Sequence, residues 1–301
     1  MLLDTKAAAR GKWLGVLTHY GLSDKQLSGR HTACPICGGK DRFRFDDKEG
    51  NGTFYCNNCG AGNGFDLVMR LRHIDFKGAL KEVAPLVGQI QITPTKPVKT
   101  ENDIQEKLRG IINGATRNVI NPYMANRGIH VKPDVWYHPA LPYFEDGKRS
   151  FHQAILGVVQ DKEGNKVAIH RTYLSDFGEK APVSNPKKLT EAIKPITGGA
   201  IRLFKPVGEV LALAEGIETA CAAYQQFGIP TWSVINAAMM ESFKIPSGIT
   251  KLIIFGDNDK SFTGQKSAYA LANKCGIECE VKIPQEANTD WADILMRGKN
   301  V

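Results

Sequence analysis

Four cysteines in two matched pairs are the strongest chemical signal in the sequence. Cys34 and Cys37 form one CxxC pair, Cys56 and Cys59 form a second, and eighteen residues separate the two. Glycines directly after each pair favour a tight knuckle in which both thiolates face one ion. Four thiolates complete the tetrahedral shell of a structural zinc ion and leave no position open for catalysis. A structural Zn²⁺ site is therefore predicted, because chance placement or a redox pair does not explain two matched knuckles.

The segment between the cysteine pairs alternates basic and aromatic side chains. In a strand, Arg42 and Arg44 project from one face while Phe43 and Phe45 project from the other. One interpretation is that the aromatic rings pack the ribbon and the arginines are solvated. The other is that the arginines contact DNA phosphates while Tyr55 or a phenylalanine stacks on a base. A small ribbon has little other core, so the arginines are the better candidates for DNA contact.

Carboxylates in the last third of the chain stand where predicted strands end, at Glu215, Asp257, Asp259, Asp290 and Asp293. In a parallel sheet the carboxyl ends of the strands gather at one edge, where ligands bind. Carboxylates gathered there repel one another unless cations neutralise them. Oxygen ligands of this kind favour catalytic Mg²⁺ or Mn²⁺, which would support phosphoryl transfer. Glu218, on the helix after Glu215, is expected to lie outside the ligand set or in solvent.

The charge of the chain is unevenly distributed. Residues 1–100 carry 15 Lys and Arg against 9 Asp and Glu, and residues 101–208 carry 16 against 11, whereas residues 209–301 carry 8 against 11. A basic surface suits a polyanion such as nucleic acid, and a nearby acidic pocket suits divalent cations that act on it. A solvated basic surface is an equally good explanation of the charge taken alone.

Helical patterns are expected over residues 5–20 and 65–83, on either side of the cysteine segment. The segments 154–160 and 167–174 predict a β-hairpin. From residue 209 onward, apolar strands, including 231–235, alternate with helices and predict a parallel, Rossmann-like sheet. The expected parts are a zinc ribbon over 1–87, a linker over 88–103, a basic α+β region over 104–208 and a Rossmann-like domain over 209–301. The fold class is thus multidomain, with α+β and α/β parts.

These motifs together resemble the DnaG-like DNA primases. Glu215-Gly216 with Asp257-x-Asp259 resembles the Toprim domain that primases share with topoisomerases and some nucleases. The ribbon and the segment 65–84 that follows it resemble the zinc-binding domain of these primases. The middle segments 170–174, 186–189 and 198–203 resemble the phage and plasmid branch of the family. The similarity covers nearly the whole chain in the order of a primase.

The resemblance assigns catalytic and metal-binding roles to Glu215, Asp257 and Asp259. The last acidic motif departs from the family, because Asp290 and Asp293 are three residues apart where DxD is usual. A carboxylate that the family often has four residues after the glutamate is Thr219 here. The basic residues expected to meet nucleic acid or nucleotide are Arg42, Arg44, Arg171, Lys187, Lys188 and Arg202.

The function implied is synthesis of short RNA primers on single-stranded DNA from ribonucleoside triphosphates, in phage, plasmid or mobile-element replication. The alternatives are a non-catalytic single-stranded DNA-binding initiation factor and a Toprim nuclease. No GxxxxGK[ST] motif is present, so the expected partner is a helicase in trans or in a longer polypeptide. No apolar run is long enough to span a membrane and no secretory signal is evident, so the protein is expected to be cytoplasmic.

Overall fold

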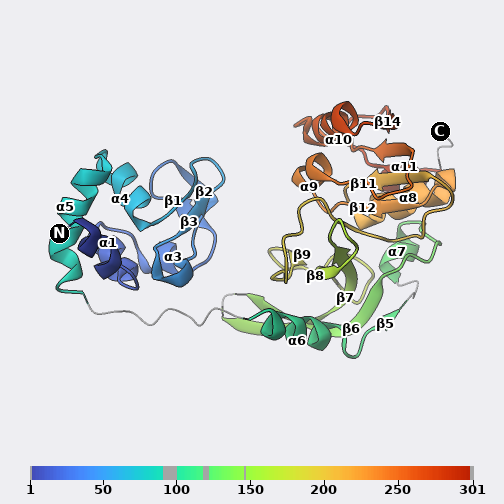
Figure 1. The fold of residues 1–301 in the computed structure, drawn as a ribbon. Helices are drawn as coiled ribbons and strands as arrows, with labels where there is room; N and C mark the ends of the chain where they lie inside the picture. Colours follow the sequence, from blue (N-terminus) through green and yellow to red (C-terminus); the bar gives the residue numbers. More distant parts are fainter. Residues whose placement is uncertain (1, 91–99, 118–121, 146, 299–301) are drawn as a thin grey trace. The chain divides into compact units, whose positions relative to one another are not determined.

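The computed structural model describes residues 2–90, 100–117, 122–145 and 147–298, which form two compact units, 1–99 and 100–301 (Figure 1). Most of the predicted linker, 91–99, lies outside the described residues. Its last residues are helical, because the Thr100 side chain and Asp103 form a capping box that starts helix α6 at Glu101. The predicted linker range therefore includes the first residues of α6.

The first unit surrounds a four-stranded antiparallel sheet with helices. The sheet has the order β1-β2-β3-β4. Its strands are β1 (Thr32–Cys34), β2 (Gly38–Phe45), β3 (Phe54–Cys56) and β4 (Gly60–Gly62). The helices are α1 (Leu2–Ala8), α2 (Trp13–His19), α3 (Asp24–Leu27), the short 3₁₀ helix η1 (Lys48–Gly50), α4 (Gly64–Arg72) and α5 (Phe76–Val87).

Each helical stretch predicted in this unit is in fact two helices. The first breaks at Gly11, which has a φ of +76° and donates its N–H to the carbonyl of Gly50 at 2.8 Å. The second breaks at His73, which has a φ of +54°, before Asp75 caps the next helix. Both breaks let the helices turn onto one core around Trp13, whose ring packs edge-on against Phe65 at 4.7 Å.

The second unit is built on one ten-stranded sheet. The strands are β5 (Thr116–Arg117), β6 (Trp136–Glu145), β7 (Lys148–Gln160), β8 (Lys166–Leu174), β9 (Lys187–Leu189), β10 (Ala200–Ile201), β11 (Val210–Ala214), β12 (Thr231–Ser233), β13 (Lys251–Phe255) and β14 (Glu278–Lys282). The helices are α6 (Glu101–Ile112), α7 (Pro122–Asn126), α8 (Ile217–Phe227), α9 (Ala237–Ser242), α10 (Thr263–Lys274) and α11 (Trp291–Met296).

The sheet joins the middle region to the Rossmann-like region. β14, β13, β11 and β12 pair in parallel, as predicted. β7 and β8 form the predicted antiparallel hairpin. The short strand β10 connects the two parts, since it pairs with both β7 and β12. Residues on both sides of position 208 therefore share one core, which includes residues from Tyr123 to Trp291.

Strand β12 is shorter than predicted because the chain turns sharply after it. Ile235 has a φ of +73°, a conformation that costs energy for a β-branched residue. Its N–H donates to the carbonyl of Glu215 at 2.8 Å, and the Ser233 hydroxyl donates to the same carbonyl at 2.7 Å. The strained turn thus holds the backbone at Glu215, the first of the predicted site residues.

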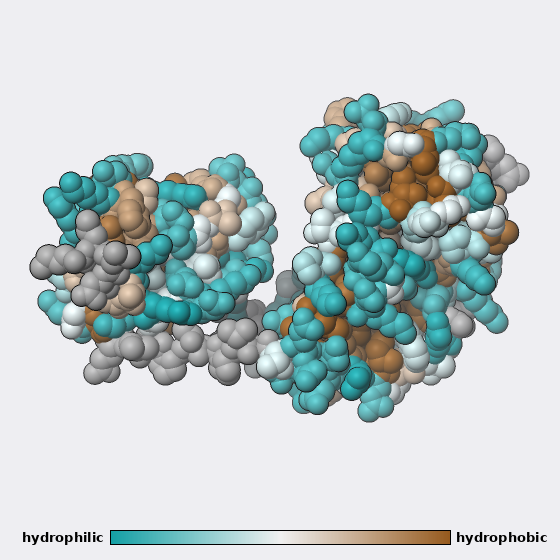
Figure 2. Space-filling model, viewed as in Figure 1, coloured by the Kyte–Doolittle hydropathy of each residue, from teal (hydrophilic) through white to brown (hydrophobic). Residues whose placement is uncertain are grey.

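No helix among the described residues is long and apolar enough to cross a membrane. Polar residues cover most of the face of each unit in the view of Figure 2, and the more extensive apolar surface lies on the second unit.

Candidate zinc site and carboxylate site

The four cysteines of the first unit meet at one point, as predicted. All four Sγ atoms lie within 4.8 Å of one another, with Cys34 and Cys59 3.9 Å apart and Cys37 and Cys56 3.7 Å apart. Zinc–sulfur bonds of about 2.3 Å in a tetrahedron place the sulfurs roughly 3.8 Å from one another. The observed separations match that value, so the residues fit a structural zinc ion.

Each pair is shaped by a knuckle of the expected kind. The N–H of Ile36 donates to Cys34 Sγ and the N–H of Cys59 donates to Cys56 Sγ, both at 3.4 Å. Gly38 and Gly60, which follow the pairs, have φ values of +72° and +81°. His31 takes no part in the cluster, and its Nδ1 lies 3.0 Å from the carbonyl of Asp41.

The strand between the knuckles has the two faces that its alternation predicts. Phe43 and Phe45 are 0% and 2% exposed, so they pack the ribbon and are not accessible for stacking on a base. Tyr55 is 44% exposed. Arg44 forms a bidentate ion pair with Asp46 at 2.7 and 3.1 Å, whereas exposed Arg42 has no ion-pair partner among the described residues.

The carboxylates of the second unit come to one edge of its parallel strands. The register pairs Ala214 with Phe255, so Glu215 follows β11 at the level where Gly256 and Asp257 follow β13. Asp290 caps helix α11 and lies near Asp257, since its charge contributes to the pKa of that carboxyl. The three segments therefore meet where parallel strands bind ligands.

Asp257 carries a buried oxygen that the fold leaves unsatisfied. Its Oδ1 is buried and has no hydrogen-bond partner among the described residues. Burial, together with the charges of Asp290, Glu215 and Asp259, raises its pKa from 3.8 to about 7. A buried carboxylate oxygen without a partner, facing other carboxylates, is an arrangement that a divalent cation would satisfy. The observed residues therefore fit Mg²⁺ or Mn²⁺.

Asp259 is held by the loop that follows it. Its Oδ1 accepts from the Ser261 hydroxyl at 2.7 Å and its Oδ2 accepts from the Gly264 N–H at 2.8 Å, and these bonds lower its pKa. A Cβ atom at Gly264 would lie 2.7 Å from the carbonyl of Asp257. Gly264 therefore allows helix α10 to approach the Asp257-x-Asp259 turn.

Asp290 and Asp293 are tied to each other by helix α11. Asp290 Oδ1 accepts from the N–H groups of Ala292 and Asp293, and Asp293 Oδ2 accepts from the Asp290 N–H at 3.1 Å. The Thr219 hydroxyl donates to Asp290 Oδ2 at 3.4 Å. The three-residue spacing that departs from DxD is thus that of a capping box. It directs Asp290 toward Asp257 and commits Asp293 to the helix end.

Glu218 is buried, which excludes the predicted solvent position. It is 6% exposed, and its carboxylate accepts from the Tyr123 hydroxyl at 2.8 Å and from Lys187 Nζ at 3.0 and 3.1 Å. Burial alone would raise the pKa of Glu218, but Lys187 and Tyr123 bring it to about 2. No motif marks Tyr123, since 95 residues separate it from Glu218.

Lys187 faces the carboxylates as well as Glu218. Burial and Asp259 raise the pKa of Glu215, and the charge of Lys187 opposes that rise. His170 lies in the same region and is buried, which, together with the charge of Lys187, lowers its pKa to about 4. Lys187 is therefore one cation that offsets negative charge at this edge, and Lys180, which interacts electrostatically with Glu218 and Asp290, is another.

The other basic residues predicted to meet nucleic acid make contacts within the fold. Arg171 donates to the Tyr173 hydroxyl and to the carbonyl of Leu189. Arg202 donates to the carbonyl of Asp161, and its guanidinium lies 4.7 Å from the centre of a Trp232 ring. Lys188 donates to the carbonyl of Phe144 and lies over the Tyr143 ring. Of the basic residues predicted to meet nucleic acid, all of them described, Lys187 is the one whose charge acts on Glu215 and Asp257.

The two candidate sites differ in how closely their metal-binding atoms are gathered. In the parts of the chain that the structure describes, the four cysteines are the only group of three or more His, Cys, Asp or Glu ligands gathered within 4.8 Å. The carboxylates influence one another through space without forming such a group.

Three family comparisons cover most of the chain. Residues 29–65 match the zinc-binding domain of primase-helicase, residues 104–203 match a domain of unknown function named DUF7146, and residues 210–300 match the Toprim domain.

Solved primase structures are similar over most of this chain. The primase fragment of the bacteriophage T7 primase-helicase is 14% identical, with a TM-score of 0.40, over 89% of this chain and 95% of that one. The zinc-binding and RNA polymerase domains of the Aquifex aeolicus primase are 13% identical, with a TM-score of 0.45, over 98% and 82%. By its family matches, the chain carries a primase-type zinc ribbon and a Toprim domain in one polypeptide.

Proposed function

We propose that this chain is a DNA primase that synthesises short RNA primers on single-stranded DNA by two-metal nucleotidyl transfer. The observation that carries the proposal is the presence, in one chain, of a primase-type zinc ribbon and a Toprim edge whose Asp257 has a buried, unpartnered oxygen. Its substrates would be ribonucleoside triphosphates and its setting the replication of a phage, plasmid or mobile element. A helicase, in trans or in the same polypeptide, would be its partner.

The zinc ribbon would bind the single-stranded template. Arg42 is exposed and has no ion-pair partner in the described residues, so it is free to contact a phosphate. Tyr55 on the neighbouring strand is 44% exposed and presents an aromatic face for a base. Arg44 contributes less, because Asp46 already neutralises its guanidinium.

Glu215, Asp257, Asp259 and Asp290 would hold the divalent ions. Bound ions of this kind lower the pKa of an attacking 3′-hydroxyl and stabilise the charge of a pyrophosphate leaving group. Asp293 would position Asp290 through the capping box. Burial raises the pKa of Glu215, so in its ionised form it would accept a proton more readily than an exposed carboxylate would.

Lys187 would bind the phosphates of an incoming nucleotide or of the template at this edge. Its Nζ is held by Glu218 at 3.0 Å, and its side chain is 37% exposed, so it is both positioned and accessible. Glu218 and Tyr123 would act as positioning residues for it. This arrangement keeps a cation beside the carboxylates without filling the ligand positions.

One observation favours a non-catalytic DNA-binding factor as the second candidate. Asp259 and Asp290 already accept several hydrogen bonds, and Thr219 stands where the family often has another carboxylate. Such an edge would bind metal weakly. The two candidates differ in one measurable property, the formation of RNA.

The deciding experiment incubates the zinc-loaded chain with single-stranded DNA of varied sequence, labelled ribonucleotides and Mg²⁺ or Mn²⁺. We expect oligoribonucleotides that depend on the template. Asp257→Asn should reduce their formation about 1,000-fold, because it removes a charge where transition-state charge is stabilised. Glu278→Gln is the matched control, since Glu278 stands at the opposite end of the same parallel strands, beside Lys251.

Two results would count against the proposal. Absence of RNA on every template, with DNA binding retained, would favour the non-catalytic factor. Full activity of Asp257→Asn would place the catalytic centre elsewhere.

A further inference from the structure

A large cavity in the second unit lies apart from the carboxylate edge. It has a volume of about 970 Å³ and lies between helix α6, with the turn that follows it, and strands β7 and β8. Pockets for small ligands have volumes of about 300–1,000 Å³. No residue of the carboxylate edge lines it, and none of the contacts assigned above to the proposed reaction involves it.

The floor of the cavity is apolar. Val158 of β7 and Ala168 and Ile169 of β8 form its strand side, and Leu108 and Ile112 face them from α6. The same part of the unit shows apolar surface near α6, β6 and β7 in Figure 2. A flat apolar group entering here would leave water and be stabilised in proportion to the area it buries.

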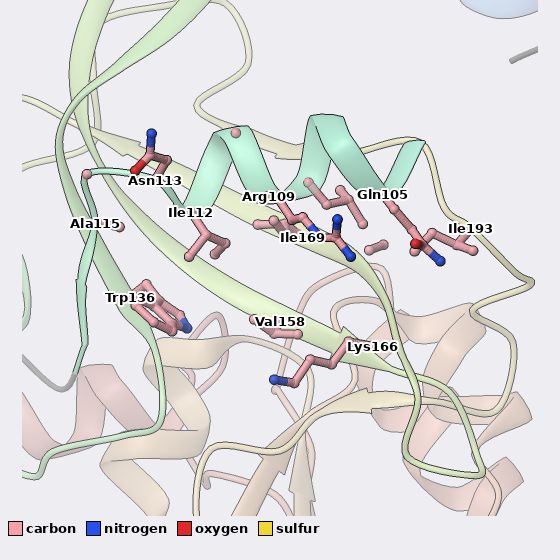
Figure 3. A pocket seen from close by; sticks show the side chains of 14 residues that line it. Gln105, Arg109, Ile112, Asn113, Ala115, Trp136, Val158, Lys166, Ile169 and Ile193 are labelled. Atoms are coloured by element: carbon pink, nitrogen blue, oxygen red, sulfur yellow. The ribbon is translucent and has the colours of Figure 1, made fainter. Parts of the chain in front are cut away.

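The charged groups of the cavity are all of one sign. Arg109 on α6 and Lys166 at the start of β8 line it, and no acidic side chain does so among the described residues. Neither cation has a hydrogen-bond or ion-pair partner for its side chain in the parts of unit 2 that are described. In Figure 3, Arg109 lies on the helix side of the cavity and Lys166 on the strand side. The ligand that complements them is an anion.

Aromatic and amide groups make the site more selective. The Trp136 ring lies at one end of the cavity and Gln105 lies toward the other end (Figure 3). The Arg117 guanidinium lies 5.7 Å from the centre of a Trp136 ring, and no described residue accepts a hydrogen bond from Trp136 Nε1. An aliphatic anion would leave these donors and acceptors unpaired. A nucleotide offers a planar base for the apolar floor, polar base edges for the amides and a multiply charged phosphate group for the two cations.

We propose that this cavity is a nucleotide-binding site separate from the Toprim edge. Its base would lie on the apolar floor near Trp136, and its phosphates would bind Arg109 and Lys166. Helix α6 and strands β7 and β8 belong to the unit that also carries the carboxylates.

Calorimetric titration of the full zinc-loaded chain with ATP and AMP, without added divalent ion, tests the site. We expect one equivalent to bind, with both nucleotides, and Arg109→Ala combined with Lys166→Ala to weaken binding at least about tenfold. The control is Lys107→Ala combined with Lys148→Ala, which removes two charges from the same helix and hairpin away from the cavity lining. Circular dichroism checks that each variant is folded.

The outcomes separate cleanly. Absence of saturable binding below about 1 mM, or equal affinity in the two double variants, would overturn the proposal. If the aromatic sulfonate 8-anilinonaphthalene-1-sulfonate binds but neither ATP nor AMP does, the assignment to nucleotides would be overturned. The titration does not require primer synthesis, so its failure and failure of the primase proposal are distinguishable.

Discussion

The zinc ribbon and the carboxylate edge both collect metal-binding side chains, but they are assembled in opposite ways. Each cysteine pair comes from one short knuckle, and the four sulfurs lie within 4.8 Å of one another. The carboxylates come from three segments between Glu215 and Asp293, and they do not form such a closed group. Neighbouring turns can determine a thiolate site almost alone. A site of repelling carboxylates depends on the whole sheet and on the cation that neutralises it.

The largest effect is expected when one cysteine of the zinc site is replaced. Cys56→Ser should lose zinc and unfold the ribbon, because a structural zinc ion of this kind contributes roughly 10–16 kcal/mol of apparent binding energy to folding. Metal analysis and limited proteolysis would measure this, with the unit of residues 100–301 remaining resistant. Cys275→Ser, outside the ribbon, is the control. Retention of one zinc per chain by Cys56→Ser would refute the four-thiolate site.

The next effect concerns Lys187 at the carboxylate edge, where variants can distinguish its role in stability from its role in primer synthesis. Lys187→Ala leaves buried Glu218 without its ion-pair partner, although Tyr123 still donates to it and Lys187 is partly exposed, so unfolding free energy should fall by about 1–3 kcal/mol. Lys187→Met combined with Glu218→Gln should recover most of that stability but not primer synthesis. Lys194→Ala, at an exposed lysine outside the predicted nucleic-acid residues, is the control. Full activity in the double variant would show that Lys187 only stabilises the fold.

The free energy of unfolding should depend on pH because of Asp257 at the carboxylate edge. The pKa of Asp257 is about 7 in the fold against 3.8 ordinarily, so the folded chain binds more protons than the unfolded chain between these values. Stability without divalent ions should therefore decrease as pH rises from about 4 to 7, by at most about 4 kcal/mol. Asp257→Asn should lose this part of the slope in thermal or urea unfolding, and Mg²⁺ should reduce it. An identical slope in both proteins would contradict the raised pKa.

The smallest effect tests the departure from DxD. If Asp293 serves chiefly as the reciprocal partner in the capping box, Asp293→Ala should reduce stability by about 1 kcal/mol and leave metal affinity nearly unchanged. Asp290→Asn should instead weaken metal binding, measured by calorimetry with Mn²⁺. A larger loss of Mn²⁺ affinity in Asp293→Ala than in Asp290→Asn would return Asp293 to the ligand set.

Local patterns in the sequence determined the zinc ribbon, the hairpin of β7 and β8, and the parallel strands with their carboxylates at one edge. The knuckles need only a CxxC pair and a following glycine such as Gly60, and the strands need only apolar runs that end in a turn. These signals arise from residues close together in the chain, so they do not depend on the rest of the fold.

The tertiary structure decided which of the charged side chains are accessible for contact with nucleic acid or metal. Nothing local shows that Glu218 is buried between Tyr123 and Lys187, or that Arg202 lies on Trp232. It also decided that β10 joins the middle strands to the Toprim strands in one sheet. Burial and long-range pairing depend on segments far apart in sequence, and these control the pKa and accessibility of a side chain more than its type does.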